Sequence, residues 1–260
     1  MAVRCRRGEG SDGEEEIDPA ITMAARLREL LLQENDQSGA SRKRKIVLLA
    51  GGPGSGKTTL AERAASLVRE NARVCVLPMD GFHIRKAQLD AEGLQRRGAP
   101  FTFDLGSLIA AMKSLRAADS ADMEWPRFDH ARGDPSAPGD GICVTRDDTL
   151  ILIEGNYLLL ERAVSPDGSI ESRWGELASF ANECWFVTCD ADEANSRLVA
   201  RHMAANNNTQ EEAWTRVRTN DSLNFALIHE SFLSLPNDAV HLVVDNSPTK
   251  SPSVSHTTAS

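Results

Sequence analysis

The segment 51–58 constrains the fold of this chain more than any other feature. It reads Gly-Gly-Pro-Gly-Ser-Gly-Lys-Thr, which matches the G-x-x-x-x-G-K-[ST] pattern of a phosphate-binding P-loop. The apolar run 45–50 before it predicts a buried strand, and the residues from Thr58 onward predict a helix. That helix has one apolar stripe, formed by Leu60, Ala61, Ala64, Leu67 and Val68. Strand, glycine loop and helix in this order are the context that the motif requires.

The residue types of this segment suit a polyphosphate. Glycines let consecutive backbone N–H groups turn inward, and the start of the following helix adds about half a positive charge. Lys57 can reach the β- and γ-phosphates, and Thr58 can hold Mg²⁺. The sequence therefore predicts a site for a nucleoside triphosphate, made by Gly51, Gly52, Gly54, Ser55, Gly56, Lys57, Thr58 and Thr59.

The bulk composition argues against several classes of partner. The net charge is −9 over 260 residues, whereas nucleic acids and anionic membranes are bound by basic surfaces. We therefore expect a small-molecule partner, and the oligomeric state stays open. The five cysteines form no C-x-x-C pair and no metal spacing with histidine, which indicates free thiols in a reducing compartment. No secretory or membrane-spanning segment is evident, so the expected location is the cytoplasm.

Apolar runs and helical patterns alternate along the chain. Strands are predicted at 45–50, 73–79, 150–153, 184–189 and 240–244, with short strands at 124–128 and 142–146. This alternation predicts an α/β P-loop fold, a doubly wound and mainly parallel sheet with flanking helices and a small helical lid. The expected organisation is a disordered acidic segment 1–17, one P-loop domain at 18–245, and a disordered Ser/Thr/Pro-rich tail 246–260. Within the domain, a first helix is expected at 18–36, with Asp18 as N-cap, and the lid at about 197–220.

Ligands of such sheets lie at the C-terminal ends of the strands, so polar residues that end a strand are candidates for chemistry. Asp80 follows the second strand, and a carboxylate beside the P-loop strand could take a proton from an attacking hydroxyl. An ordinary Asp-Gly turn is the alternative interpretation. Glu154 follows the strand 150–153, at a position typical of a Mg²⁺ site, with a solvated strand end as the alternative.

Three further features allow both a functional and an ordinary interpretation. Asp104 directly precedes a helix, so it is a helix N-cap or a contact to a substrate hydroxyl. The loop 126–135 combines aromatic and charged residues, as a substrate-binding loop or a solvated turn would. Arg197 and Arg201 lie on one helix face, where they could clamp a transferring phosphoryl group or be surface residues.

Together these motifs resemble the uridine kinase, phosphoribulokinase and pantothenate kinase family of P-loop small-molecule kinases. The resemblance runs from about residue 20 to residue 245 and is strongest to the uridine-kinase-like subgroup. The matching segments are Met-Asp-Gly-Phe-His at 79–83, Arg-Arg-Gly-Ala-Pro-Phe-Thr-Phe-Asp at 96–104, Phe-Asp-His at 128–130, Glu-Gly-Asn-Tyr-Leu-Leu-Leu at 154–160 and Arg-Leu-Val-Ala-Arg-His at 197–202.

The resemblance implies ATP-dependent phosphorylation of a hydroxyl on a small metabolite, with ATP and Mg²⁺ as cofactors. It implies that Asp80 is the base, that Thr58 and Glu154 surround Mg²⁺, and that Lys57, Arg197 and Arg201 act on the phosphates. The acceptor pocket would be lined by Asp80, Phe82, His83, Phe103, Asp104, Phe128, Asp129, His130, Arg132, Asn156 and Tyr157.

The chain departs from the family pattern at two places. Uridine kinases usually carry Tyr where His83 stands, and Tyr-Asp-Phe where Arg127, Phe128 and Asp129 stand. Those positions help to hold the nucleoside in that family, so their change argues against uridine itself as the acceptor. The resemblance still implies a nucleoside-like acceptor, and pantothenate and sugars stay open as alternatives.

Two functions of other classes are also considered. A GTPase switch would carry an N-K-x-D guanine motif, which the sequence lacks. Asp90-Ala91-Glu92-Gly93 matches D-x-x-G, but no apolar strand precedes it. A nucleotide-binding scaffold without turnover is the other alternative, and the intact Lys57, Thr58, Asp80 and Glu154 argue against it.

Overall fold

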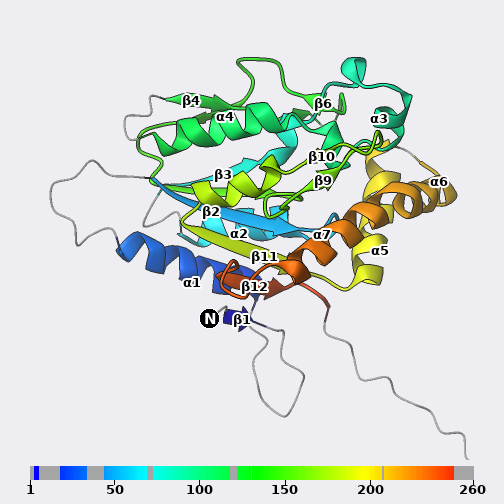
Figure 1. The fold of residues 1–260 in the computed structure, drawn as a ribbon. Coiled ribbons are helices and arrows are strands. Elements are labelled where there is room, and N and C mark those ends of the chain that lie inside the picture. The colour runs from blue at the N-terminus through cyan, green and yellow to red at the C-terminus, as the bar shows by residue number, and fades with distance from the viewer. Residues whose placement is uncertain are drawn as a thin grey trace, which may run out of the picture.

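The computed structural model describes residues 3–5, 18–33, 44–68, 73–117, 122–129, 131–206 and 208–248. Its centre is a six-stranded parallel sheet with the strand order β1-β12-β11-β2-β8-β3 (Figure 1). The strands are β1 (Val3–Cys5), β2 (Lys45–Gly51), β3 (Val74–Pro78), β8 (Leu150–Gly155), β11 (Glu183–Thr188) and β12 (Leu242–Asp245).

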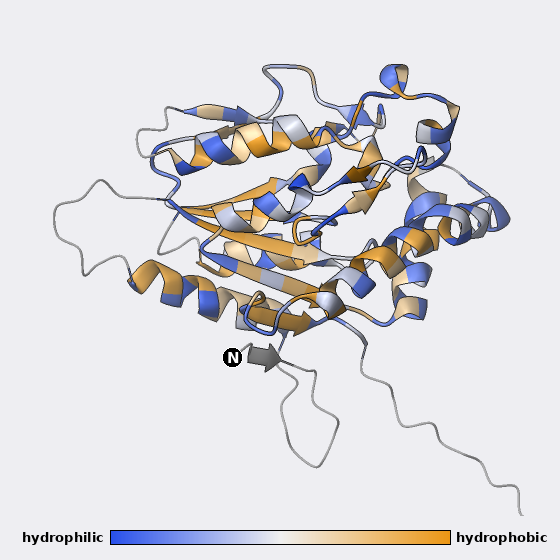
Figure 2. Ribbon diagram, in the orientation of Figure 1, coloured by the Kyte–Doolittle hydropathy of each residue, from blue (hydrophilic) through white to orange (hydrophobic). Residues whose placement is uncertain are grey.

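The central strands form because their sequences are apolar runs rather than alternating patterns, as expected for strands that are covered on both faces. Every residue of β8 is buried, and β2 is buried from Ile46 to Gly51. Figure 2 shows the same strands as the most hydrophobic part of the chain. The predicted doubly wound fold is thereby confirmed.

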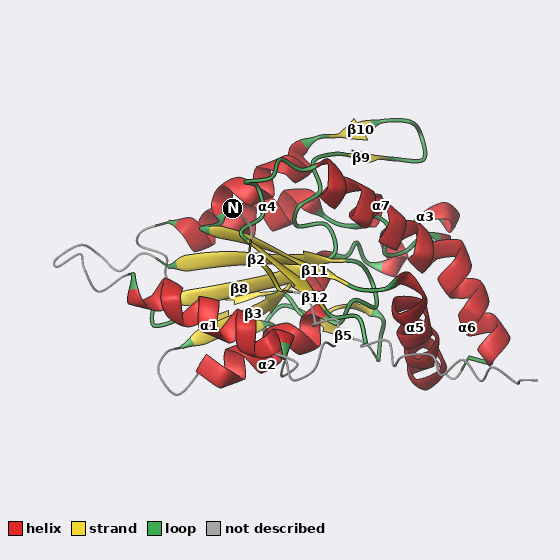
Figure 3. Cartoon of the chain, turned by 90° about the horizontal axis from the view of Figure 1, so that it is seen from below, coloured by secondary structure: helices red, strands yellow, loops and turns green. Residues whose placement is uncertain are grey.

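Helices cover both faces of the sheet, as the view from below shows (Figure 3). On one face, α1 (Pro19–Leu32) and α2 (Lys57–Val68) pack over Val47, Leu49 and Trp185. On the other, α4 (Leu105–Arg116), the 3₁₀ segment η4 (Arg173–Phe180) and α7 (Ser222–Ser234) pack over Leu48 and Ile153. Leu67 departs from the predicted apolar stripe of α2, since it is 44% exposed.

The remaining helices lie beyond the C-terminal ends of the strands (Figure 1). They are α5 (Ala191–Asn206), α6 (Gln210–Arg216) and a π-helical turn, η5 (Val217–Asp221), which leads into α7. None of the helices in the described part of the chain has the length and apolar character needed to span a bilayer.

Short helices and strand pairs fill the connections between the main elements. The single-turn and short helices are η1 (Met79–Phe82), η2 (Lys86–Gln88), α3 (Ala91–Gln95) and η3 (Pro100–Thr102). Three antiparallel pairs accompany them: β4 (Met123–Trp125) with β7 (Ile142–Val144), β5 (Phe128–Asp129) with β6 (Asp134–Pro135), and β9 (Ala163–Val164) with β10 (Ile170–Glu171).

The structure differs from the predicted boundaries at both ends of the domain. Val3–Cys5, which lies within the segment predicted to be disordered, pairs with β12. Asn246 and Ser247, which lie within the segment predicted to be a disordered tail, are hydrogen-bonded to β11 and to Asp190. The rest of both segments lies outside the described residues. Helix α1 begins after its predicted N-cap Asp18, whose carboxylate accepts a hydrogen bond from the Ala20 N–H at 3.0 Å.

Glu183 offers a test of how α1 is held on the sheet. This 4% exposed carboxylate, at the start of β11, is paired with Arg26 of α1 and accepts a hydrogen bond from Trp185 Nε1 at 2.7 Å. We expect Glu183→Ala to lower the free energy of unfolding by about 2–4 kcal/mol, because it leaves two donors without their acceptor. Urea denaturation measures this change.

Glu29→Ala is the matched control for that experiment, since Glu29 also pairs with Arg26 but is 58% exposed. Its expected effect is below about 1 kcal/mol. Equal losses in the two variants would contradict the assigned role of Glu183.

Candidate active site

The P-loop wraps the end of β2 and leads directly into α2, which begins at Lys57. Gly54 and Gly56 have φ angles of 77° and 84°, in the left-handed region that favours glycine. A side chain at Gly54 would also place its Cβ 2.4 Å from the carbonyl oxygen of Ala194. The loop is thus a backbone cradle at a helix N-terminus, which is the geometry that binds anions.

Ser55, in the middle of this cradle, carries an unpaired polar atom. The residue is fully buried, and its Oγ has no hydrogen-bond partner among the described residues. Buried hydroxyls are rarely left unpaired, so this atom is consistent with a bound phosphate oxygen as its partner. The cradle therefore fits the triphosphate predicted from the sequence.

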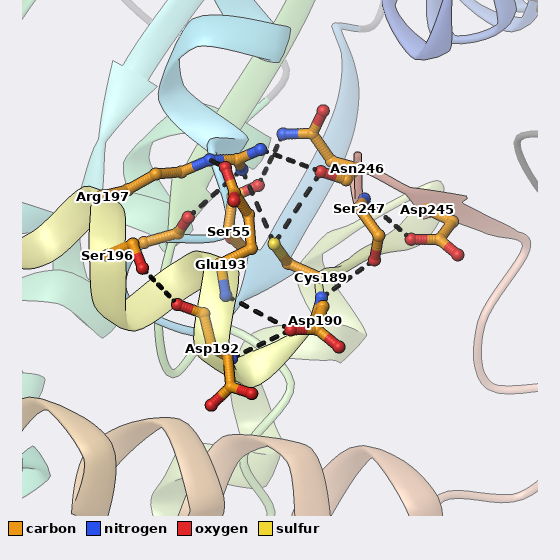
Figure 4. A network of polar contacts seen from close by, with 11 residues as sticks. Ser55, Cys189, Asp190, Asp192, Glu193, Ser196, Arg197, Asp245, Asn246 and Ser247 are labelled. Atoms are coloured by element: carbon orange, nitrogen blue, oxygen red, sulfur yellow. Dashed lines mark hydrogen bonds and ion pairs between the residues drawn. The ribbon is translucent and has the colours of Figure 1, made fainter. Parts of the chain in front are cut away.

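A layer of side chains supports the P-loop from outside (Figure 4). Asn246 donates from Nδ2 to the carbonyl oxygen of Ser55 at 2.8 Å. Arg197 donates to the carbonyl oxygens of Asn246 at 3.2 Å and Gly54 at 3.5 Å, and it forms an ion pair with Glu193 at 2.7 Å. The sequence analysis missed Asn246, because that residue begins a Ser/Thr/Pro-rich stretch interpreted as a tail.

Lys57 lies between the P-loop and the end of β8. Its Nζ donates to Asn156 Oδ1 at 2.6 Å, and Glu154 and Asp80 lie close enough to raise its pKa. Burial is the larger influence and lowers the pKa of Lys57 below its ordinary value. Asn156, predicted to contact the acceptor, thus orients Lys57 in this structure.

Glu154 is the buried carboxylate of the site, with 5% exposure. Burial raises its pKa to about 7; Lys57 and a hydrogen bond with Thr58 lower the pKa, and Asp80 raises it further. No group of three or more His, Cys, Asp or Glu side chains that could hold a metal occurs in the described part of the chain. A Mg²⁺ ion here would instead be bound by Thr58, Glu154 and phosphate oxygens, as is usual for this ion.

Asp80 lies in η1, two residues beyond the end of β3. Sequence analysis placed its strand beside the P-loop strand, but β8 lies between them, so Glu154 faces Leu49 on one side and Pro78 on the other. Asp80 nevertheless reaches the same site, since its charge acts on Lys57, Glu154 and His83. Among the described residues, no group donates a hydrogen bond to its carboxylate.

A group of aromatic rings lies beside Asp80. His83 packs against Phe103 and Phe128, with ring centroids 4.0 Å and 4.9 Å apart, and its Nδ1 is 2.8 Å from the carbonyl oxygen of Asp80. Burial is the main cause that lowers the pKa of His83, which favours the neutral ring. Tyr157 packs edge-on against Phe103 at 5.6 Å and donates its hydroxyl to the carbonyl oxygen of Gly98. Phe82 is buried against Trp125.

The other residues predicted to contact the acceptor mainly make hydrogen bonds or ion pairs with residues close to them in the chain. Asp104 caps α4, with both carboxylate oxygens bound to Ser107, so its N-cap interpretation holds. Asp129 accepts hydrogen bonds from the N–H groups of Ala131 and Arg132 and thereby shapes its own turn. Arg132 is exposed and pairs with Asp129 at 3.4 Å, and His130 lies outside the described residues.

Arg97 is a residue of this region that the sequence analysis missed. It forms an ion pair with Asp134 at 2.7 Å, and its guanidinium lies 5.9 Å from the centre of the Phe128 ring. Its backbone carbonyl accepts hydrogen bonds from Arg216 and Asn220, which lie on α6 and η5. Arg97 thus links the aromatic group to the helices beyond the sheet. Arg97 belongs to the Arg-Arg-Gly segment that matches the family pattern, and this match could have identified it from the sequence.

The two predicted phosphate-clamping arginines differ in their surroundings. The guanidinium of Arg197 is engaged with the carbonyl side of the P-loop, as described above. Arg201 is exposed one turn later on α5, and its charge lowers the pKa of Lys57. The charge of Arg201 therefore acts on Lys57, whereas Arg197 holds the backbone of the P-loop.

Several relatives found by comparison with known proteins are named as kinases. No protein-family model matches the chain. It is 30% identical over 202 residues to "Putative uridine kinase C227.14" of Schizosaccharomyces pombe, covering 74% of this chain and 81% of that protein. It is 36% identical over 135 residues to "ATP-dependent kinase-like protein notR'" of Aspergillus versicolor, covering 49% and 72%.

A solved structure agrees with these relatives. The crystal structure of a "putative fructose transport system kinase" from Silicibacter sp. TM1040 has a TM-score of 0.68 and 28% identity, covering 85% of this chain and 98% of that one. The chain belongs to the uridine-kinase-like family of P-loop small-molecule kinases. Relatives with the name of an ATP-dependent kinase imply that this family uses ATP, but the names of the relatives differ and do not fix the acceptor of this chain.

Glu154 makes the stability of the ligand-free kinase depend on pH. Its pKa in the folded chain, about 7, lies above the ordinary value of 4.5. The folded state therefore binds more protons than the unfolded state between about pH 4.5 and 7, and the contribution of Glu154 to stability decreases as pH rises through this window. We expect Glu154→Gln to remove that decrease, as measured by urea denaturation at several pH values. An unchanged profile in the variant would contradict the assignment.

Arg197 and Arg201 form a matched pair for a second test. Because Arg197 is bound to the P-loop backbone, Arg197→Gln should lower the melting temperature by several degrees, equivalent to about 1–2 kcal/mol. Arg201→Gln should leave the melting temperature unchanged, because the exposed residue makes no such bonds. Differential scanning calorimetry measures both. A larger decrease in melting temperature for Arg201→Gln than for Arg197→Gln would contradict the assignment of Arg197 as the residue that holds the P-loop.

Proposed function

We propose that this kinase transfers the γ-phosphoryl group of ATP to a hydroxyl group of a small, nucleoside-like acceptor. The observation that carries the proposal is the convergence of Lys57, Glu154 and Asp80, which come from three neighbouring strand ends and act on one another electrostatically. Phosphoryl transfer requires positioning and neutralisation of charge more than covalent chemistry by the protein.

Each residue has one task in this proposal. The cradle at 51–58 and Lys57 bind the β- and γ-phosphates, and Asn156 keeps the Lys57 ammonium in place. Thr58 and Glu154 would hold Mg²⁺, which when bound supplies further neutralisation of phosphate charge. Asp80 accepts the proton of the acceptor hydroxyl as its oxygen attacks the γ-phosphorus. Arg201 stabilises the charge of the transferring group.

The aromatic group beside Asp80 supports a nucleoside-like acceptor. His83, Phe103 and Phe128 can hold a planar ring by stacking and edge contacts, within reach of the proposed base. A relative that carries the name of a uridine kinase agrees with this choice. Pantothenate and sugars are the alternatives within the same chemistry, and a nucleotide-binding scaffold without turnover is the alternative of another class.

The test is a coupled assay of ADP release with Mg²⁺ and ATP across nucleosides, pantothenate and its relatives, sugars and sugar phosphates. We expect a nucleoside or nucleoside-like compound to raise turnover well above background. If pantothenate or a sugar alone stimulated ADP release, the proposed acceptor would be wrong and the proposed phosphoryl transfer would stand. ATP binding without stimulation by any member of the panel would favour the scaffold.

Asp80→Asn tests the base directly. Its turnover should fall by at least about 100-fold, because general-base catalysis contributes a factor of that order or more. Its affinity for ATP, measured by calorimetry, should stay within about twofold of wild type. Loss of ATP binding in this variant would show that Asp80 has a structural role instead.

A further inference from the structure

A large groove opens beside the proposed catalytic carboxylate. Its volume is about 860 Å³, and its lining includes Gly81, Phe82 and His83, which directly follow Asp80 in the chain. Binding sites for drug-sized molecules have volumes of about 300–1,000 Å³. The groove is therefore large enough for a molecule considerably bigger than a simple sugar.

Three separate parts of the chain form the walls of this groove. One wall is the segment 100–107, which runs from η3 into α4. The second is the segment 135–138, which follows β6, together with Pro126. The third is the β9–β10 hairpin with the start of η4, and this hairpin projects from the body of the molecule (Figure 3). The groove is thus a feature of the tertiary fold, and it begins at the residues that directly follow Asp80.

Much of the lining is apolar. Phe103 and Trp174 contact each other edge-on at 6.4 Å, and both are buried, as is Phe82. Along β9, Ala163 faces the groove and is buried, opposite Glu171 of β10. The larger apolar residues of the lining are Phe82, Ile84, Phe101, Phe103, Leu105 and Trp174.

The charged residues of the lining are already paired within the walls. Arg85 donates to the carbonyl oxygens of Pro135 and Ser136, and Glu171 pairs with Arg173 at 2.8 Å. Glu124 accepts hydrogen bonds from two backbone N–H groups, and Asp104 from Ser107. An ionic ligand would have to compete with these bonds, whereas an apolar ligand would leave them intact.

We infer that the groove binds a large apolar part of the acceptor, an alkyl, acyl or aryl group remote from the hydroxyl that receives the phosphoryl group. The inference rests on the proposed function for its account of the hydroxyl at Asp80. The stacking group of His83, Phe103 and Phe128 holds the part next to that hydroxyl, and the groove selects for the remote part. Affinity then increases with the length of the apolar part.

Primary n-alkanols test this inference with the simplest suitable probe, since each is a hydroxyl with an apolar chain. Isothermal titration calorimetry on the full chain would follow the series from 1-butanol to 1-decanol. Each added methylene should tighten binding by about fourfold until the groove is filled. An affinity that does not change with chain length, or no binding of 1-decanol, would overturn the inference.

Two variants locate the binding. Ala137→Trp and Ser165→Trp fill the groove from opposite walls, and neither residue belongs to the proposed catalytic machinery. Both should weaken binding of 1-decanol by at least tenfold. Ala178→Trp is the control, because Ala178 is exposed on η4 and does not line the groove. Wild-type affinity in both groove variants, with circular dichroism showing intact folds, would place the alkanol elsewhere and overturn the inference.

The outcomes separate this inference from the proposed function. The affinity for alkanols could increase with their length although no acceptor is phosphorylated. That result would support the role of the groove and count against the kinase reaction. Small acceptors could be phosphorylated although the affinity for alkanols does not depend on their length. That result would support the kinase reaction and overturn the role of the groove.

Discussion

The site is organised around the partly buried ammonium group of Lys57. Removing a cation from water is unfavourable, and burial alone lowers the pKa of this group. Glu154 and Asp80 oppose that effect, and Asn156 accepts the hydrogen bond that fixes the position of Nζ. These groups do not fully offset the effect of burial on the Lys57 ammonium group. A triphosphate would add negative charge at the same place, so the site is arranged to favour a bound anion.

This arrangement follows from the order of the parallel strands. Strand β8 lies between β2 and β3, so Glu154 lies between the P-loop and the segment of Asp80. The raised pKa of Glu154 is the cost of burying a carboxylate there, and a divalent cation would offset it by favouring the charged form. The same edge of the sheet is closed by α5, whose Arg197 and Glu193 support the P-loop from outside.

The sequence predicted the fold and the phosphate cradle well because both depend on local patterns. The apolar runs specify the buried strands, and the glycine spacing specifies the loop. The order of the strands depends on tertiary packing, so the position of β8 between β2 and β3 could not be deduced from those runs. The hydrogen bond from Asn246 to Ser55 spans 191 residues and has no local signal. The same holds for the ion pair of Arg97 with Asp134.

For the candidate site, the sequence did not specify the contacts that its side chains make in the folded chain. Asp104 was interpreted as an N-cap or an acceptor contact and Asp129 was named for the acceptor, and both accept hydrogen bonds from residues two or three positions further along the chain. Asn156 was named for the same purpose, and it binds Lys57. Such assignments depend on side-chain orientation, which strand and helix patterns do not specify. The groove beside Asp80 was likewise invisible, since three distant segments form it.

The central claim is that the P-loop and Asp80 face one another across a site for phosphoryl transfer. A crystal structure with Mg²⁺ and a non-hydrolysable ATP analogue tests it most directly. The account predicts that the β- and γ-phosphates lie in the cradle at 51–58 against Lys57. It also predicts that the Asp80 carboxylate faces the γ-phosphorus across a gap wide enough for one hydroxyl group. A triphosphate bound elsewhere, or a γ-phosphate directed away from Asp80, would contradict it.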